Sequence, residues 1–491
     1  MASSVLRATA VLTASTMVTI GVGVVAAKCR ALLLGTSGFG VLALEQSFLS
    51  MVGLVAGLSV STGLVRLGAP ALSRGETETI EALRQAALGG MTLIGLAAFA
   101  LLQLGARPLE TVVFSGLLNG RDIAVLGLAL GLQLVSGAQT GILNAYHQVG
   151  ALAKSSAISA VVGSSLNVTL IFCWGRDGIA PGLLAVAATT FVVQRWFLAT
   201  RIPAIHALHP FPRLRAAAAD LLKWGVGYTA SSIVDLGSVA LVPFLVLRSL
   251  GASSVGLYQA ASTIAVTYLS FLTTSMGQDY YPRLAASKHS PEATVDIINE
   301  RHRILLLLGV PVILLALTLL PYLIPLVYTR RFEPAVSILN WQLIGDILRL
   351  ASWTVSFVIV THFDSWTYFF TQSVAGGLLL LSTWFGMQWL GLSGLGLGFL
   401  VTPAVYFLVV VAVVKRQVPL VWSRANKLLL SGSIAAALFL RAIAWVGMGA
   451  TAQMLIGLCL AGTAAVFTYS ELWLKRMRPL TPRVQPAESV R

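Results

Sequence analysis

Seven ionisable residues interrupt otherwise apolar stretches of the sequence and are the first candidates for chemistry. They are Lys28, Arg30, Glu45, Asp235, Arg248, Asp346 and Arg349. A charged side chain in the hydrocarbon of a membrane costs ~2.5–3.5 kcal/mol or more, so residues of this kind are usually functional or paired. These seven positions therefore come before any other feature of the chain.

The three cations suit an anionic ligand, because a guanidinium group offers a fork of donors that matches phosphate oxygens. The alternative is that these long side chains extend to the headgroups at the membrane surface. Lys28 fits both interpretations equally well. Arg30 and Arg248 each directly precede a Leu-Gly element that occurs twice in the chain, which favours anion binding for these two.

The carboxylates leave more than one interpretation open. Asp346 and Arg349 are three residues apart and share one helix face, so they form either a local salt bridge or a coupling or substrate site. Glu45 and Asp235 serve a coupling cation or sugar hydroxyls, or else are hydrogen-bonded carboxylates in a helical core. All four are candidates for coupling or substrate contacts.

Several kinds of chemistry have no signature in the sequence. There is no G-x-x-x-x-G-K-[ST] nucleotide motif, no paired D-x-D carboxylates and no H-E-x-x-H metal motif. The three cysteines, Cys29, Cys173 and Cys459, are too few and too scattered for a disulfide framework or a metal site. We expect no catalytic residue, no metal and no cofactor, so the chain is not expected to be an enzyme.

The composition indicates which elements position these residues. Of the 491 residues, 57% are hydrophobic and only 10% are charged, and the mean hydropathy is +0.85. A soluble chain of this length cannot cover its surface with so few charges. The net charge of +15 is therefore interpreted as loop charge that orients a membrane protein, and no nucleic-acid partner is expected.

The apolar stretches predict an all-α polytopic membrane protein with about 14 transmembrane helices, because a membrane crossing needs roughly 20 residues. Most of the 33 basic residues fall in loops on the side of the N-terminus, so both termini are expected to be cytoplasmic. The predicted spans are 8–27, 41–65, 86–104, 123–143, 155–174, 179–193, 224–247, 257–276, 304–328, 336–360, 366–387, 393–414, 428–446 and 450–473.

An internal repeat divides the chain. Leu34-Gly35 with Gly40 matches Leu250-Gly251 with Gly256 at an offset of 216, and further pairs keep an offset of 216 or 217. Six spans separate equivalent elements, so the copies are parallel, and proteins of this kind place the substrate path between their two halves. The expected organisation is a six-helix lobe over 1–200, a basic linker over 201–223, a second six-helix lobe over 224–416, two extra helices over 417–474 and a basic tail over 475–491.

Three segments resemble a known family. Residues 30–40 and 250–258 are similar to the stretches that follow the first span of each lobe in Wzx-type polysaccharide flippases. Residues 341–353, which contain Gly345-Asp346, resemble the Gly-Asp span of flippases for O-antigen units and enterobacterial common antigen. These flippases belong to the multidrug/oligosaccharidyl-lipid/polysaccharide exporter superfamily. The resemblance covers about residues 5–415, and the last two predicted spans depart from the commoner twelve-span form.

The resemblance implies a flippase for short oligosaccharides on undecaprenyl pyrophosphate. Such a protein moves its cargo from the cytoplasmic to the periplasmic leaflet of the bacterial inner membrane by alternating access, for O-antigen, lipopolysaccharide or related polysaccharide biosynthesis. The implied partners are the lipid-linked oligosaccharide, membrane lipids, a polysaccharide polymerase and a chain-length regulator. The alternatives are a cation-coupled multidrug-type exporter or a peptidoglycan-precursor flippase of the same superfamily, and, from a different class, an enzyme of envelope glycan assembly.

Overall fold

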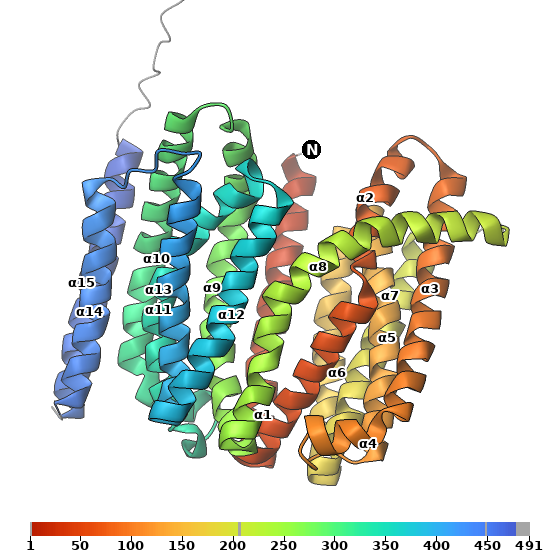
Figure 1. Cartoon of the computed structure of the whole chain (residues 1–491), viewed down its shortest axis with the longest axis horizontal. Helices are drawn as coiled ribbons and strands as arrows, with labels where there is room; N and C mark the ends of the chain where they lie inside the picture. The colour runs from red at the N-terminus through yellow and green to blue at the C-terminus, as the bar shows by residue number, and fades with distance from the viewer. Residues whose placement is uncertain (1, 205–207, 447–448, 478–491) are drawn as a thin grey trace, which may run out of the picture. The chain divides into compact units, whose positions relative to one another are not determined.

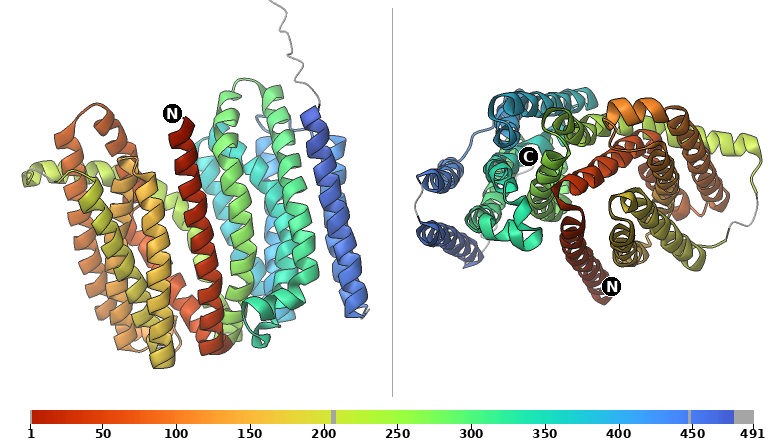
Figure 2. Two further views of the ribbon diagram at one scale, coloured as in Figure 1. Left: turned by 180° about the vertical axis from the view of Figure 1, so that it is seen from behind. Right: turned by 90° about the horizontal axis from the view of Figure 1, so that it is seen from below.

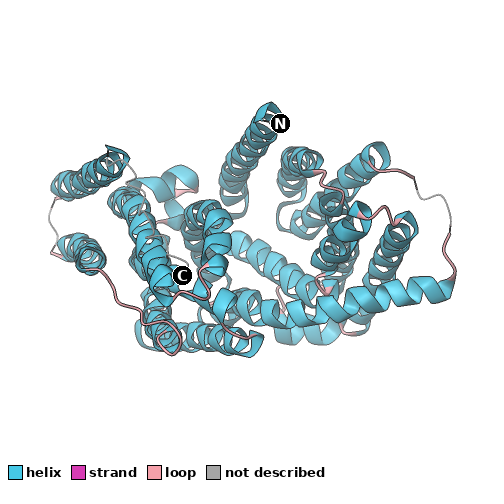
Figure 3. Cartoon of the chain, turned by 90° about the horizontal axis from the view of Figure 1, so that it is seen from above, coloured by secondary structure: helices cyan, strands magenta, loops and turns pink. Residues whose placement is uncertain are grey.

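The computed structural model describes residues 2–204, 208–446 and 449–477 of the chain. Within these ranges the chain consists of helices and the loops that connect them, and no strand occurs there (Figure 3). The predicted all-α class is confirmed. The helices are α1 (Ala2–Gly57), α2 (Val60–Ser73), α3 (Thr77–Leu104), α4 (Ala106–Pro108), η1 (Leu109–Val113), α5 (Gly120–Ala145), α6 (Val149–Trp174), η2 (Gly175–Gly178), α7 (Ile179–Arg201), α8 (Phe211–Leu250), α9 (Ala252–Ala286), α10 (Pro291–Val327), η3 (Arg330–Phe332), α11 (Ala335–His362), α12 (Ser365–Leu390), α13 (Leu392–Val414), α14 (Arg424–Trp445) and α15 (Ala450–Met477).

Eleven helical ranges in the described residues are long and apolar enough to cross a membrane. Two of these ranges hold two helices each: Ala14–Gly57 contains both halves of α1, and Val149–Arg201 contains α6 and α7. Counting each of those helices separately and adding α12, a further long apolar helix, the described chain agrees with the predicted number of about 14 spans.

The first two predicted spans form one long helix with a break. Residues 28–40, expected to connect two spans, are helical except at Gly35, which has φ 62° and ψ −168°. Figure 2 shows the two halves of α1 meeting at an angle. The predicted end of the second span at Val65 is wrong, because Leu58 and Ser59 adopt positive φ values and separate α1 from α2.

The break in α1 has a counterpart where α8 meets α9. Gly251, 216 residues after Gly35, has φ 79° and ψ 172°, close to the conformation of Gly35. A positive φ combined with an extended ψ is open to glycine and strained for other residues. The sequence repeat is therefore visible in the backbone at the position where each copy turns.

The two copies approach each other directly after these breaks. A methyl group on Gly40 would lie 1.9 Å from the carbonyl oxygen of Ala252, and one on Gly256 would lie 2.0 Å from that of Thr36. Thr36 and Ala252 are themselves equivalent in the repeat, so the contact is reciprocal. The Thr36 and Ser253 hydroxyl oxygens are 2.7 Å apart and add a hydrogen bond beside the contact.

A second set of glycines repeats in the same way. Gly175 and Gly391 end α6 and α12 with nearly identical dihedral angles, φ 59° and ψ −128° against φ 57° and ψ −130°. Gly178 then lies against the carbonyl of Leu170, and Gly394 against that of Gly386, again at an offset of 216. The offset found in the sequence thus marks equivalent helix–helix contacts.

The described chain forms two compact units. Unit 1 comprises residues 1–266, 321–342 and 363–406, and unit 2 comprises residues 267–320, 343–362 and 407–491. In unit 1, α5 packs on α2, α3 and α7, and α1 packs on α6 and α8. The first part of α8 crosses the ends of α2 and α3 before the helix turns (Figure 1), so the linker expected over 201–223 is helical from Phe211.

In unit 2 the two helices beyond the repeat pack against α10. The Asn426 side chain donates to the backbone carbonyl of Asn299 at 2.9 Å, and the Thr468 hydroxyl donates to that of Leu307 at 2.7 Å. Arg303 on α10 forms an ion pair with Glu471 on α15. Inside a membrane, lipid tails are as apolar as helix surfaces, so the hydrophobic effect does little to drive helices together. Polar contacts such as these therefore help to hold the helices together.

The reciprocal contact makes a stability prediction. Gly40→Ala and Gly256→Ala place a methyl group where a carbonyl oxygen lies, so each should cost about 1–3 kcal/mol and lower the thermal midpoint of the detergent-solubilised protein. Gly90→Ala in α3 is the control, because a methyl group there meets nothing within 4 Å and favours helix. Midpoints for Gly40→Ala and Gly256→Ala equal to that of Gly90→Ala would contradict the contact.

Candidate functional site

The cations next to the two breaks bind backbone carbonyls in a reciprocal pattern. Lys28 Nζ on α1 donates to the carbonyl of Pro325 at 2.8 Å. Arg248 Nη2 on α8 donates to the carbonyl of Val112 at 2.9 Å. Pro325 lies near the end of α10 and is the counterpart of Pro108 in the repeat, while Val112 lies in η1, just after Pro108. The helix before each break therefore contacts a similar region of the other copy. Lys28 and Arg248 were both predicted from the sequence as anion-binding candidates. Their carbonyl partners could not be predicted and are seen only in the structure.

Aromatic side chains pack beside these regions. Phe39, just after the first break, packs edge-on against Tyr328 and Phe332, with ring centroids 5.6 and 5.5 Å apart. On the other side, Phe114 packs edge-on against Phe48 and Phe244, at 5.3 and 6.0 Å. These T-shaped pairs join the helix after the first break to Tyr328 and Phe114, which are close in sequence to Pro325 and Val112.

Arg30 and Arg331 add positive charge at the first break. Arg30 is half-buried, and its Nε has no hydrogen-bond partner among the described residues. A methyl group on Gly35 would lie 3.6 Å from Nη1 of Arg331, so the guanidinium of Arg331 lies beside the break. Sequence reasoning missed Arg331, because its loop is nearly 300 residues from Gly35 and no local pattern joins the two.

The positive charges around the breaks are not neutralised by acids. Within the described part of the chain, Lys28, Arg30, Arg248 and Arg331 take part in no ion pair. Lys28 and Arg30 are half-buried, whereas Arg248 and Arg331 are exposed. A group of cations without carboxylate partners is suited to a multiply charged anion. The pattern therefore supports an anion-binding surface at this end of unit 1, which we call the break cluster (Lys28, Arg30, Arg248 and Arg331).

Glu45 is a carboxyl buried in the second half of α1. Only 2% of the residue is exposed, and its Oε2 has no hydrogen-bond partner among the described residues. A buried carboxyl with an unsatisfied oxygen is a candidate for binding a proton or a cation. The side chain of Asp235 lies outside the described residues.

Asp346 lies in unit 2 and has a tyrosine partner. Tyr268 donates its hydroxyl to Oδ2 of Asp346 at 2.7 Å, and Asp346 is 5% exposed. Arg349 is exposed, and within the described part of the chain no ion pair joins it to Asp346, so the salt bridge that the spacing allows is not formed in this structure. No local pattern in the sequence indicates Tyr268, which is 78 residues from its partner.

The comparisons with known proteins agree with this architecture. The family model described as "Polysaccharide biosynthesis protein" matches residues 30–337. The lipid III flippase of Escherichia coli K12 is 24% identical over 419 residues, covering 80% of this chain and 94% of the relative. The lipid III flippase of Shigella flexneri matches to the same extent.

Solved structures define the class of fold. The lipid II flippase MurJ in an inward closed conformation superposes with a TM-score of 0.73 at 13% identity, over 95% of this chain and 99% of that chain. An inward-facing multidrug resistance MATE transporter of the MOP superfamily gives 0.60 at 16% identity, over 79% and 93%. The fold is that of the MOP-superfamily transporters.

Within that class the family is shown by the sequence itself. The matched region holds most of the chain, and it begins at Arg30 and includes both breaks. This chain belongs to the polysaccharide biosynthesis protein family.

The Tyr268–Asp346 contact predicts an effect on stability. Tyr268→Phe leaves a buried carboxyl without its donor, which should cost about 1–3 kcal/mol and lower the thermal midpoint in detergent. Tyr469→Phe on α15 is the matched control, because Tyr469 is 70% exposed. If both variants have the same thermal midpoint as the wild type, the Tyr268 hydroxyl does not stabilise Asp346.

Proposed function

We propose that this protein is a flippase that moves oligosaccharides linked to undecaprenyl pyrophosphate from the cytoplasmic to the periplasmic leaflet of a bacterial inner membrane. The cargo would serve O-antigen, lipopolysaccharide or related surface polysaccharide. The observation that carries the proposal is the break cluster, whose cations form no ion pair with an acid in the described part of the chain. The relatives of this chain include lipid III flippases.

The break cluster matches the chemistry of a pyrophosphate. The head of the cargo carries two adjacent phosphates, and arginine binds phosphate oxygens through two parallel hydrogen bonds. Arg30 Nε has no hydrogen-bond partner among the described residues, and Nη1 of Arg331 lies beside the Gly35 break. Lys28 and Arg248 are bound to single carbonyls, so each retains further donors.

Alternating access follows from the repeat. In transporters made of parallel repeats, the substrate path lies between the copies and its access alternates as one copy moves against the other. At the end that carries the breaks, the helices of the two copies are in direct backbone contact through Gly40 and Gly256. Movement of cargo past that end requires the contact to open, and the carbonyl bonds of Lys28 and Arg248 to be exchanged for others.

The driving force would come from a gradient or from the membrane potential. Moving one charge through 100 mV is worth about 2.3 kcal/mol, enough to bias a conformational equilibrium substantially. Glu45 and Asp346 are the buried carboxyls available for such coupling, with Asp235 and Arg349 as further coupling or substrate contacts. Both termini would be cytoplasmic, and a polysaccharide polymerase and a chain-length regulator would act on the delivered cargo.

A peptidoglycan precursor is the second candidate cargo. It is favoured by the likeness to MurJ, which extends over 95% of this chain and therefore beyond the repeat. Both cargoes are amphiphiles with a charged phosphate linkage, so the break cluster serves either one. The sugar composition of the accumulated intermediate separates the two.

The experiment uses a strain that lacks the gene and resolves its lipid-linked intermediates by leaflet and by sugar composition. One undecaprenyl-linked oligosaccharide should accumulate on the cytoplasmic side, and the wild-type gene should remove it. Arg248→Ala and Arg30→Ala should leave at least about tenfold more cytoplasmic intermediate than the wild type, because each loses charge-assisted bonds to the pyrophosphate. Arg201→Ala, an exposed cation at the end of α7, is the control and should behave as the wild type.

Three results would contradict parts of the proposal. Normal intermediates together with raised sensitivity to small cationic drugs would indicate an exporter. Accumulation of a peptidoglycan precursor would replace the proposed cargo. Full complementation by Arg248→Ala and Arg30→Ala would remove the break cluster from the transport path.

A further inference from the structure

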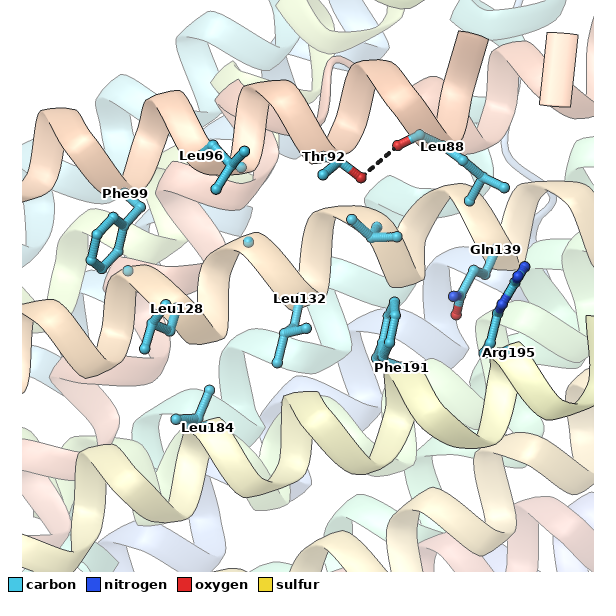
Figure 4. Close-up of a pocket in the computed structure, with 14 residues that line it drawn as sticks. Leu88, Thr92, Leu96, Phe99, Leu128, Leu132, Gln139, Leu184, Phe191 and Arg195 are labelled. Atoms are coloured by element: carbon cyan, nitrogen blue, oxygen red, sulfur yellow. Dashed lines mark hydrogen bonds between the residues drawn. The ribbon is translucent and has the colours of Figure 1, made fainter. Parts of the chain in front are cut away.

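A long apolar groove runs over the surface of unit 1 between α3 and α7, with α5 as its floor (Figure 4). Its volume is about 680 Å³. Leucine and phenylalanine side chains form its walls, and several remain exposed, including Leu96 at 62% and Leu128 at 50%. The Thr92 hydroxyl donates to the carbonyl of Leu88 within its own helix, so it presents no free donor to the groove.

Glycines give the groove its depth. Gly95 on α3 lies against Gly131 on α5, where a methyl group on Gly95 would be 3.0 Å from the Gly131 Cα. Both glycines line the groove, and Gly127 lines it one turn further along α5. With no side chains at these positions, a chain of methylene groups can lie close to the helix backbones.

One end of the groove is polar. Gln139 and Arg195 line it there, and Figure 4 shows the two side chains next to each other. Gln139 is 1% exposed, and its Oε1 has no hydrogen-bond partner among the described residues. Arg195 is exposed and forms no ion pair in the described part of the chain. A buried amide that opens on a groove beside an unneutralised guanidinium indicates a polar, anionic ligand group.

We propose that this groove binds one acyl chain of an anionic glycerophospholipid, with the lipid phosphate at Arg195. From Leu88 to Phe99 the groove follows α3 for about 16 Å, which is about half the hydrocarbon thickness of a bilayer and so the depth of one leaflet. An acyl chain of membrane length fits that depth when its headgroup lies at the polar end. Arg195 selects the negative headgroup, and Gln139 can accept a hydrogen bond from a headgroup hydroxyl.

This site is separate from the break cluster, and its occupation does not depend on the transport proposal. The lipid it binds is a component of the surrounding membrane, so the site stabilises the packing of α3, α5 and α7 in a membrane that contains anionic lipid. Binding to the folded state alone raises its stability with lipid concentration.

The test is native mass spectrometry of the full-length purified protein titrated with palmitoyl-oleoyl phosphatidylglycerol or with phosphatidylcholine of the same chains. The wild type should bind phosphatidylglycerol about five- to tenfold more tightly than phosphatidylcholine. Arg195→Gln should remove most of that preference, and Arg201→Gln, further along α7, should keep it. The titration is repeated with undecaprenyl phosphate.

A second pair of variants tests the groove itself. Leu96→Trp places an indole in the groove and should weaken binding of both phospholipids. Leu93→Trp, on the same helix and 69% exposed but outside the groove, should leave binding unchanged. Both positions are on the surface, so neither variant disturbs the core, and matching thermal midpoints verify this.

The proposal is overturned if the protein does not distinguish the two headgroups, or if Arg195→Gln binds as Arg201→Gln does. It is also overturned if Leu96→Trp binds as Leu93→Trp does, because the lipid then lies elsewhere. Binding of undecaprenyl phosphate without phosphatidylglycerol would show that the groove takes a prenyl chain instead.

Discussion

The contact between Gly40 and Gly256 is the constraint on which the rest of the structure depends. Because neither residue has a side chain, the helices that follow the two breaks approach each other backbone to backbone. The breaks at Gly35 and Gly251 set the direction of those helices, and only glycine holds that conformation without strain. The approach brings Lys28 and Arg248 to the carbonyls of the opposite copy, so the positions of the cations follow from the glycines.

This arrangement places several positive charges beside the two breaks. Lys28 and Arg248 each donate to one backbone carbonyl, and Arg30 Nε has no hydrogen-bond partner among the described residues. In the described part of the chain, no ion pair to an acid joins these residues or Arg331. Charges held without counterions near hydrocarbon reduce stability unless a ligand offsets them. A pyrophosphate headgroup is such a ligand, and in this account binding and opening are linked because the cargo competes with the carbonyls for the same donors. We propose the buried carboxyls Glu45 and Asp346 as the residues for coupling.

The sequence predicted the features that depend on local pattern. Span number follows from the length of apolar runs, and the repeat follows from glycines at one offset, since each marks a turn or a close contact in both copies. The helix through residues 28–40 was missed because Lys28 and Arg30 interrupt the apolar run, although a helix tolerates them and breaks only at Gly35. The partners of the site residues are distant in the chain. Tyr268, which donates to Asp346, is 78 residues away, and Arg331 lies beside Gly35 although nearly 300 residues separate them. Such pairs depend on tertiary packing, which periodicity does not encode.

The most direct test is a reversible lock on the contact between the two copies. The Thr36 and Ser253 hydroxyls are 2.7 Å apart, so Thr36→Cys with Ser253→Cys should form a disulfide once Cys29, Cys173 and Cys459 are replaced by serine. Translocation of a lipid-linked oligosaccharide is then measured in proteoliposomes before and after reduction, with each single-cysteine variant as a control. The account predicts that the oxidised double variant does not translocate its cargo and that reduction restores translocation. Undiminished translocation by fully cross-linked protein would show that the contact is a fixed pivot and contradict the account.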